Sequence, residues 1–228
     1  MTIRTNGELT RELKGQGGAR FCPCDFHVHS PASHDVAARS DLNDLEKDRL
    51  KPFLGTSPKD WAKHQREVLT AFPPAEYLSY LTKRRDEVVA KLGIGEYNRW
   101  AVLAITDHNI CTYAVQLARA AWDERKQNKL IVLPGIELDV VFPIPAAEDA
   151  AIHMLCIFSP CVDSSDIRKA ICDASSADWK EGNESLTVTN LQEFVNNLRH
   201  HTHYPSMVIA AHVWSRKGVQ NEVKRLLT

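Results

Sequence analysis

The sequence predicts an α/β fold built on parallel strands with connecting helices, and two observations support this prediction. Apolar segments of strand length alternate with longer segments of helical pattern roughly five times along the chain. Two of the apolar segments, Trp100–Thr106 and Ala151–Phe158, are continuous except for His153 in the second. Continuous apolar strands are typical of parallel sheets, where helices cover both faces.

Bulk composition is ordinary for a globular protein. The chain has 228 residues, of which 43% are hydrophobic and 25% charged. We predict a flexible lead-in over residues 1–19 and one domain over residues 20–228, with a polar insertion at about 35–73. The net charge of −1 indicates no whole-chain basic surface for nucleic acid, which leaves only a local basic patch as an option.

The same composition bears on compartment. No apolar run is long enough to span a membrane, and the N-terminal segment lacks the apolar core of a secretion signal. We therefore expect a cytoplasmic protein whose six cysteines are reduced. Cys22 and Cys24 have no matching cysteine pair elsewhere, so we do not interpret them as a metal site.

The N-terminal half is expected to contain two strands and two helices. A first strand over residues 20–28 ends in a turn-prone cluster, and a short helix over 59–70 lies within the polar insertion. Pro74 opens a second helix whose apolar residues form one stripe at helical spacing, and Gly93 ends it. Residues 100–106 form the second strand.

The C-terminal half continues the alternation. A third strand over residues 130–133 is expected to stop at Pro134-Gly135, with a separate extended piece over 136–142. Thr189 is expected to cap a helix. The other expected elements are helices over 112–126, 164–172 and 218–227, strands over 151–158 and 207–211, and a polar loop over 173–186.

A histidine pair marks the end of the first strand, in Asp25-Phe26-His27-Val28-His29-Ser30. Alternation along a strand sends residues i and i+2 to one face, so Asp25, His27 and His29 should point the same way. Two imidazoles on one face can chelate a single metal ion.

Further potential ligands follow the other strands. Asp107-His108 follows the second strand, Glu137 the third and His212 the fifth, while His153 lies inside the fourth. Because the chemistry of parallel α/β folds gathers at the carboxyl ends of strands, we expect these side chains to converge. Each has an ordinary explanation by itself: His153 as a hydrogen-bonded core residue, Asp107 to Asn109 as a helix cap. Their recurrence is what favours a metal site.

A second histidine group, His200, His201 and His203, is denser but sits near a predicted helix end. Favourable placement at a helix C-terminus explains it, so we leave it out of the site.

The motifs and their order resemble those of the PHP domain, the polymerase and histidinol phosphatase superfamily, over residues 20 to about 215. The matching segments are Asp25 to Ser30, Ile105 to Asn109, Pro134 to Glu137, Ile152 to Leu155, and Ala211-His212. The polar insertion after the first motif is similar to that of PHP-ATPase proteins of the TrlF type, in which a PHP domain precedes a large ATPase.

The resemblance implies a distorted barrel of parallel strands with outer helices, and up to three divalent ions, usually zinc, manganese or iron. By motif position, His27 and His29 would hold one ion, and Glu137 would bridge it to a second held by His153 and His212. His108 would hold a third, with His34 preferred over Asp35 as a further ligand. The resemblance also suggests that Asp25 and Asp107 orient imidazoles. Arg216 or Lys217 could meet a substrate phosphate, although solvation at the surface is the simpler interpretation.

The chain departs from this family at its end. The family closes with an Asp-x-His motif, whereas no Asp or His follows His212. No phosphate-binding Gly-x-x-x-x-Gly-Lys-Ser/Thr loop is present either, so we expect no ATPase within these residues. We expect the front part of a longer protein, with a barrel incomplete at its C-terminal end and fewer than three metals. An ATPase domain or a protein partner would cover the open edge.

Three functions are compatible with these observations. The favoured one is a metal-dependent phosphoesterase acting on a phosphomonoester or phosphodiester, with Glu137, His153 and His212 acting through bound metal and water. Because the last motif is missing, we expect a truncated form with little or no turnover alone. A second is a non-catalytic regulatory or interaction domain of a larger ATPase, which the missing last motif favours. A third is an amidohydrolase, a class that also begins with His-x-His but commonly uses a carboxylated lysine where this chain offers Glu137.

Overall fold

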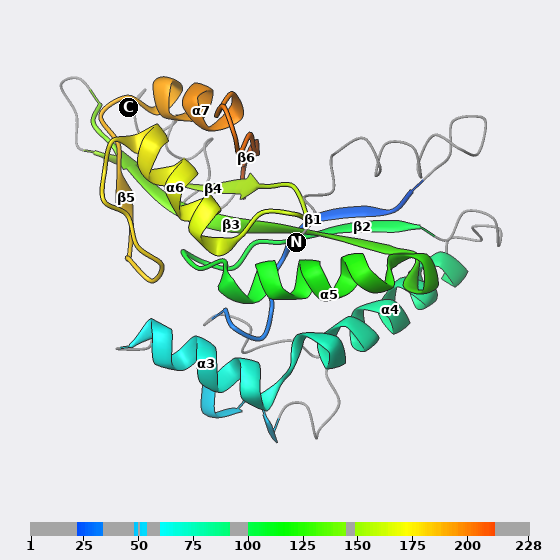
Figure 1. Ribbon diagram of the computed structural model, residues 1–228. Helices are drawn as coiled ribbons and strands as arrows, with labels where there is room; N and C mark the ends of the chain where they lie inside the picture. Colours follow the sequence, from blue (N-terminus) through cyan, green and yellow to red (C-terminus); the bar gives the residue numbers. More distant parts are fainter. Residues whose placement is uncertain are drawn as a thin grey trace.

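Six strands pair into one curled sheet in the computed structural model (Figure 1). The structure describes residues 22–33, 48–49, 51–53, 60–91, 100–144 and 149–212. The expected lead-in over residues 1–19 and the expected helix over 218–227 lie outside these ranges.

The sheet is mostly parallel. Its spatial order is β1-β2-β3-β4-β6, and β5 pairs with β3 beside this path. β1, β2, β3 and β5 pair in parallel, whereas β4 is antiparallel to both β3 and β6. The strands are β1 (Cys24–Val28), β2 (Ala101–Ile105), β3 (Leu130–Phe142), β4 (Ala150–Ile157), β5 (Leu186–Thr187) and β6 (Met207–Ala210). Strands lie where the sequence predicted them, except that the pieces expected over 130–133 and 136–142 form one strand and that β5, which begins at the last residue of the expected loop, was not predicted. The expectation of parallel pairing is wrong at β4.

Contrary to the prediction, Pro134-Gly135 does not end the third strand. Pro134 pairs with Ile105, and its carbonyl oxygen accepts a hydrogen bond of 2.8 Å from the Phe158 amide. A Cβ atom on Gly135 would lie 2.9 Å from the Thr106 methyl group and 3.0 Å from the Cys156 carbonyl oxygen. β3 therefore continues without a break, and the short connection from Phe142 back to β4 makes the next pairing antiparallel.

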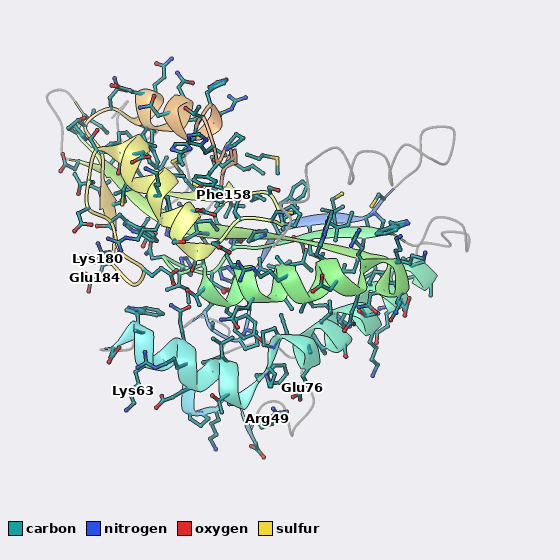
Figure 2. The ribbon with its side chains drawn as sticks, in the orientation of Figure 1. Arg49, Lys63, Glu76, Phe158, Lys180 and Glu184 are labelled. Atoms are coloured by element: carbon teal, nitrogen blue, oxygen red, sulfur yellow. The ribbon has the colours of Figure 1, made fainter. Side chains whose placement is uncertain are left out.

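The helices agree with the predicted ones within the described residues. They are η2 (Lys51–Phe53, a 3₁₀ turn), α3 (Trp61–Ala71), α4 (Pro74–Lys91), α5 (Thr112–Asn128), α6 (Ser164–Ser175) and α7 (Leu191–Arg199). The cap of α7 is Asn190 rather than Thr189: its side chain accepts a hydrogen bond of 3.1 Å from the Glu193 amide. Arg49, in the polar insertion, pairs with Glu76 of α4 and lies over the ring of Phe72, which follows α3 (Figure 2).

The two faces of β3 have different roles. Its even-numbered residues, such as Val132 and Ile136, pack against α5 and α6, which are in turn covered by α4 and α7 (Figure 1). Its odd-numbered residues face the inside of the curl. There, Leu133 packs in a small apolar cluster with residues of β2, β4 and β6. Glu137 and Asp139 lie farther along this inner face, so the sheet places a carboxylate pair inside its curl.

No helix among the described residues is both long and apolar enough to cross a membrane. All six cysteines are free thiols.

Candidate metal centre

The Glu137 carboxylate is fully buried and is surrounded by five imidazoles. Its Oε2 atom lies 2.9 Å from His27 Nε2 and 3.4 Å from the Nε2 atoms of both His29 and His108. Its Oε1 atom lies 2.6 Å from His153 Nδ1 and 3.2 Å from His212 Nε2. Histidines from four strands, β1, β2, β4 and β6, or from the residues that follow them, thus meet at one carboxylate of β3.

The five imidazoles form a closed circle. Neighbouring ring centroids are 4.5 to 5.7 Å apart, in the order His27, His29, His108, His153, His212 and back to His27. His27 belongs to β1 and His212 follows β6, and these are the two end strands of the sheet. The sheet must therefore curl toward its inner face for the circle to close.

A β-bulge aims the first histidine into this circle. The pairing register of β1 with β2 shifts between Asp25 and Val28. Phe26 consequently packs in the inner apolar cluster while Val28 packs in the core beneath α5. The prediction that Asp25 points the same way as His27 and His29 is therefore wrong. Its side chain is exposed and accepts a 3.1 Å hydrogen bond from the His27 amide. Bulges next to functional sites commonly re-aim a side chain in this way.

The turn after His29 is held by buried hydrogen bonds. The fully buried Asp107 carboxylate accepts bonds of 2.6 Å from both the amide and the hydroxyl group of Ser30. The Tyr77 hydroxyl group of α4 donates a 3.2 Å bond to the His29 carbonyl oxygen. The Ser33 hydroxyl group lies 3.1 Å from His29 Nδ1, so Nε2 is the nitrogen presented to Glu137.

His108 is fixed to β3 by the backbone on either side of it. The Glu137 amide donates to the Asp107 carbonyl oxygen at 3.0 Å, and the Asn109 amide donates to the Glu137 carbonyl oxygen at 2.9 Å. Asn109 adopts a left-handed conformation, with φ of 53°. The cap of α5 is Cys111, which makes no side-chain capping bond, so the helix-cap explanation of Asp107 to Asn109 does not apply.

His212 opens the centre to solvent. Its side chain is 40% exposed, the most of the five. Its φ of 49° is uncommon for a residue other than glycine, and such conformations cluster at functional sites. The preceding residue, Ala211, donates a 2.9 Å backbone bond to His153, which keeps the two histidines together.

The charges of the centre are strongly coupled. Burial opposes ionisation of Glu137, but hydrogen bonds from His153 and His27 and the nearby His108 imidazole hold its pKa well below its usual range. Burial lowers the pKa of His153, but the Asp139 and Glu137 carboxylates raise it to about 9. Burial lowers the pKa of His212. Without metal, the centre thus holds an anionic Glu137 and a protonated His153 at neutral pH.

These residues fit a divalent cation. Ligand atoms that share a zinc ion, with bonds of about 2.0–2.1 Å, lie about 3–4 Å apart. The Glu137 oxygen atoms lie 2.9 to 3.4 Å from the Nε2 atoms of His27, His29, His108 and His212, close to this spacing. The 2.6 Å contact with His153 Nδ1 is that of a hydrogen bond. Three sets of potential ligand atoms lie within 4.8 Å of one another: His27, Glu137 and His212; His29, His108 and Glu137; and His108, Asp139 and His153.

Asp139 is the site residue that sequence reasoning missed. It lies two residues after Glu137 on the same face of β3, directly opposite His153 on β4, and its Oδ1 atom is 2.6 Å from His153 Nε2. The period of a strand could have found it, because residues 136–142 were expected to be extended and this puts Asp139 on the same face as Glu137.

The remaining candidates fall into two groups, those outside the described residues and those placed elsewhere in the fold. His34, Asp35, Arg216 and Lys217 lie outside the described residues. His64 on α3 lies with its Nε2 atom 3.1 Å from the Ala32 carbonyl oxygen, which is a backbone contact outside the histidine circle. In the second histidine group, His201 lies 3.2 Å from Asp173 on α6.

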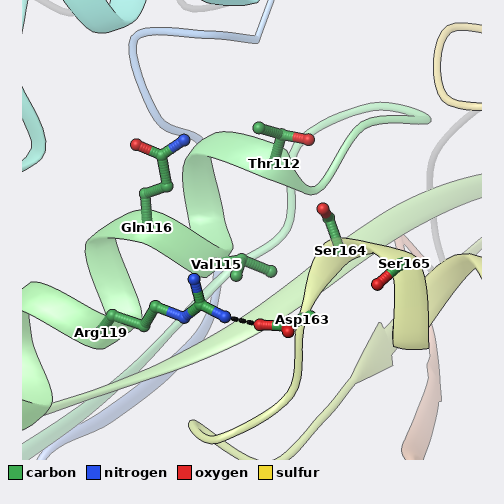
Figure 3. Close-up of a pocket in the computed structure, with 7 residues that line it drawn as sticks. All are labelled: Thr112, Val115, Gln116, Arg119, Asp163, Ser164 and Ser165. Carbon is green, nitrogen blue, oxygen red and sulfur yellow. Dashed lines mark ion pairs between the residues drawn. The ribbon is translucent and has the colours of Figure 1, made fainter. Parts of the chain in front are cut away.

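A separate pocket lies on the opposite side of the sheet, between the first turns of α5 and α6 (Figure 3). Its only charged side chains, Arg119 and Asp163, form an ion pair with each other. It contains no group of potential metal ligands, so we do not assign chemistry to it.

No protein-family model matches the chain, and no curated protein matches it. The case for a function therefore rests on the residues of the centre.

Proposed function

We propose that the chain is a metal-dependent phosphoesterase of the PHP type, and that its curled sheet is part of a barrel of that type. One observation carries the proposal: the two oxygen atoms of a single buried carboxylate face separate groups of imidazoles. Glu137 Oε2 faces His27, His29 and His108, and Oε1 faces His153 and His212.

Carboxylate and imidazole ligands suit zinc, manganese or iron. With ions bound, Glu137 would supply the negative charge, and the five imidazoles, including His153 after it has released its extra proton, would supply neutral nitrogen atoms around it. Divalent ions held there would lower the pKa of a bound water and stabilise the charge that develops on a phosphoryl group. Because His212 is the most exposed ligand, a phosphate ester would approach from its side.

The remaining residues keep the ligands in place. Ser30, Asp107 and Tyr77 hold the turn beside His29, and the backbone bonds around His108 fix it to β3. Such supporting contacts restrict the freedom of the ligands before an ion binds, which favours a defined coordination geometry. A carboxylate at this central position also favours a phosphoesterase over an amidohydrolase, which commonly uses a carboxylated lysine there.

Hydrolysis of 4-nitrophenyl phosphate and of bis(4-nitrophenyl) phosphate, with manganese, zinc or iron added to metal-free protein, tests the proposal. We expect metal-dependent hydrolysis of at least one ester. Glu137→Gln keeps the size of the side chain and removes its charge, so it should lower hydrolysis by at least 100-fold (about 2.7 kcal/mol) and reduce bound metal. Asp123→Asn is the control, because Asp123 is an exposed carboxylate on α5, which packs against the outer face of β3.

Bound metal without hydrolysis of either ester would contradict the proposed activity and favour a regulatory or interaction domain. Unchanged metal content in Glu137→Gln, checked by elemental analysis, would show that Glu137 is not a ligand.

A further inference from the structure

Asp139 and His153 meet at short range on the inner face of the sheet. They are directly opposed across β3 and β4, and Asp139 Oδ1 lies 2.6 Å from His153 Nε2. In the metal-free chain this contact is an ion pair. The same oxygen and nitrogen atoms are ligand types that zinc, manganese and iron accept, so a cation could take the place of the shared proton.

The other ring nitrogen of His153 already has a partner. Nδ1 lies 2.6 Å from Glu137 Oε1 in hydrogen-bond geometry. A metal-binding histidine usually donates its second N–H to a carboxylate, which fixes the tautomer and leaves the remaining nitrogen as the ligand. Once an ion displaces the proton on Nε2, donation from Nδ1 to Glu137 would leave the lone pair of His153 on Nε2, the atom beside Asp139.

His108 completes a set of three. Its ring is 5.2 Å from that of His153, and ligand atoms of His108, Asp139 and His153 all lie within 4.8 Å of one another. Asn109 ties two members of the set together, because it follows His108 and its side-chain oxygen accepts a 3.2 Å hydrogen bond from the Asp139 amide.

We propose that Asp139 is a direct metal ligand, and that Asp139, His108 and His153 form a divalent cation site beside the one at Glu137. This inference rests on the proposed metal-binding function of the histidine circle. It divides the five imidazoles between two carboxylates: His27, His29 and His212 serve Glu137, and His108 and His153 serve Asp139. Each cation then has one anionic ligand, and the Asp139 site has three protein ligands, the number usual in zinc sites that keep a position for water.

Cobalt substitution tests the assignment directly. In Asp139→Cys, the new thiolate should bind Co²⁺ and produce a charge-transfer band in the near ultraviolet. The band should appear in the difference between the spectra of the variant and the original protein, and it should saturate at about one equivalent of cobalt. A residue that only pairs with His153 would not produce this band. Asp123→Cys, which places a thiol on the exposed side of α5, is the control and should show no band. Circular dichroism checks that each variant is folded.

A second variant gives an independent measurement. Asp139→Asn removes the charge with little change of size, and elemental analysis after dialysis should show a loss of about one metal per chain while the Glu137 site stays filled. No band in Asp139→Cys together with unchanged metal content in Asp139→Asn would overturn the inference. If the band appears but neither ester is hydrolysed, the Asp139 site is supported and the proposed phosphoesterase activity is contradicted. If an ester is hydrolysed in a metal-dependent way but the band is absent, the activity is supported and the Asp139 site is contradicted.

Discussion

At the scale of single residues, the metal-free centre balances one buried anion against five imidazoles. His153 is the residue on which this balance depends, since it lies between the Glu137 and Asp139 carboxylates. Its pKa of about 9 in the folded chain compares with about 6.5 for a histidine in an unfolded one. A group whose pKa is raised on folding stabilises the folded state below its unfolded pKa, and this contribution is lost as the pH rises through the folded value.

We therefore predict that the metal-free protein loses free energy of unfolding between about pH 6.5 and 9. Urea unfolding in the presence of a chelator measures this loss. Other groups titrate in the same range, so the slope must be compared with that of His153→Gln, which lacks the proton. Equal slopes in the two proteins would mean that His153 does not hold the extra proton.

At the scale of elements, β3 is the strand that positions the chemistry. It pairs with β2 along its first half and with β4 along its second half, and it carries Glu137 and Asp139 past Pro134-Gly135 without interruption. Because Gly135 has no side chain, the Thr106 methyl group and the Cys156 carbonyl oxygen can lie close to the strand at this position. Two backbone carbonyl groups and one methyl group line the space that a side chain would need.

Gly135→Ala should accordingly destabilise the fold by about 1–3 kcal/mol, the usual cost of overpacking a tight site. Thr106→Ser removes the methyl group that a new Cβ would meet at 2.9 Å. The double variant should recover part of the loss, but not all of it, because the Cys156 carbonyl oxygen stays 3.0 Å away. A double-mutant cycle by chemical denaturation gives the coupling between the two positions. Strict additivity would mean that the Thr106 contact does not limit Gly135.

At the scale of the whole molecule, the centre joins the two ends of the sheet. β1 and β6 are the end strands, yet His27 and His212 meet with ring centroids 4.5 Å apart. Below them, the inner face of the curl holds only the small apolar cluster of Ala104, Leu155, Ile157 and Ala211 with its partly buried neighbours among the described residues. Ligation would therefore add to the closure of the curl.

Binding of a cation to the folded chain alone should raise its stability by about 2.7 kcal/mol at a free metal concentration 100 times the dissociation constant. For a chain of this size, that corresponds to an increase in Tm of about 5–11 °C. Calorimetry with and without a chelator measures the difference, and it should shrink in Glu137→Gln. An equal Tm with and without metal would contradict a cation that links β1 to β6.

Much of this architecture could be predicted from the sequence because the relevant signals are local. Helix stripes, the Pro74 start and the apolar runs each depend on neighbouring residues, and they correctly locate α3 to α7 and the main strands. The recurrence of His27, His29, His108, Glu137, His153 and His212 at strand positions was likewise visible, and the structure brings all six together.

Only the tertiary structure decided how these pieces pair. Whether Pro134-Gly135 ends a strand depends on Thr106 and Cys156, which are distant in sequence, and this choice makes β4 antiparallel. The bulge in β1 depends on its register with β2, so alternation alone misplaced Asp25. Asp139 becomes a candidate ligand only because the antiparallel register sets it opposite His153. A sequence pattern specifies which face a residue occupies within its own strand, whereas the neighbour on that face is chosen by strand pairing across the sheet.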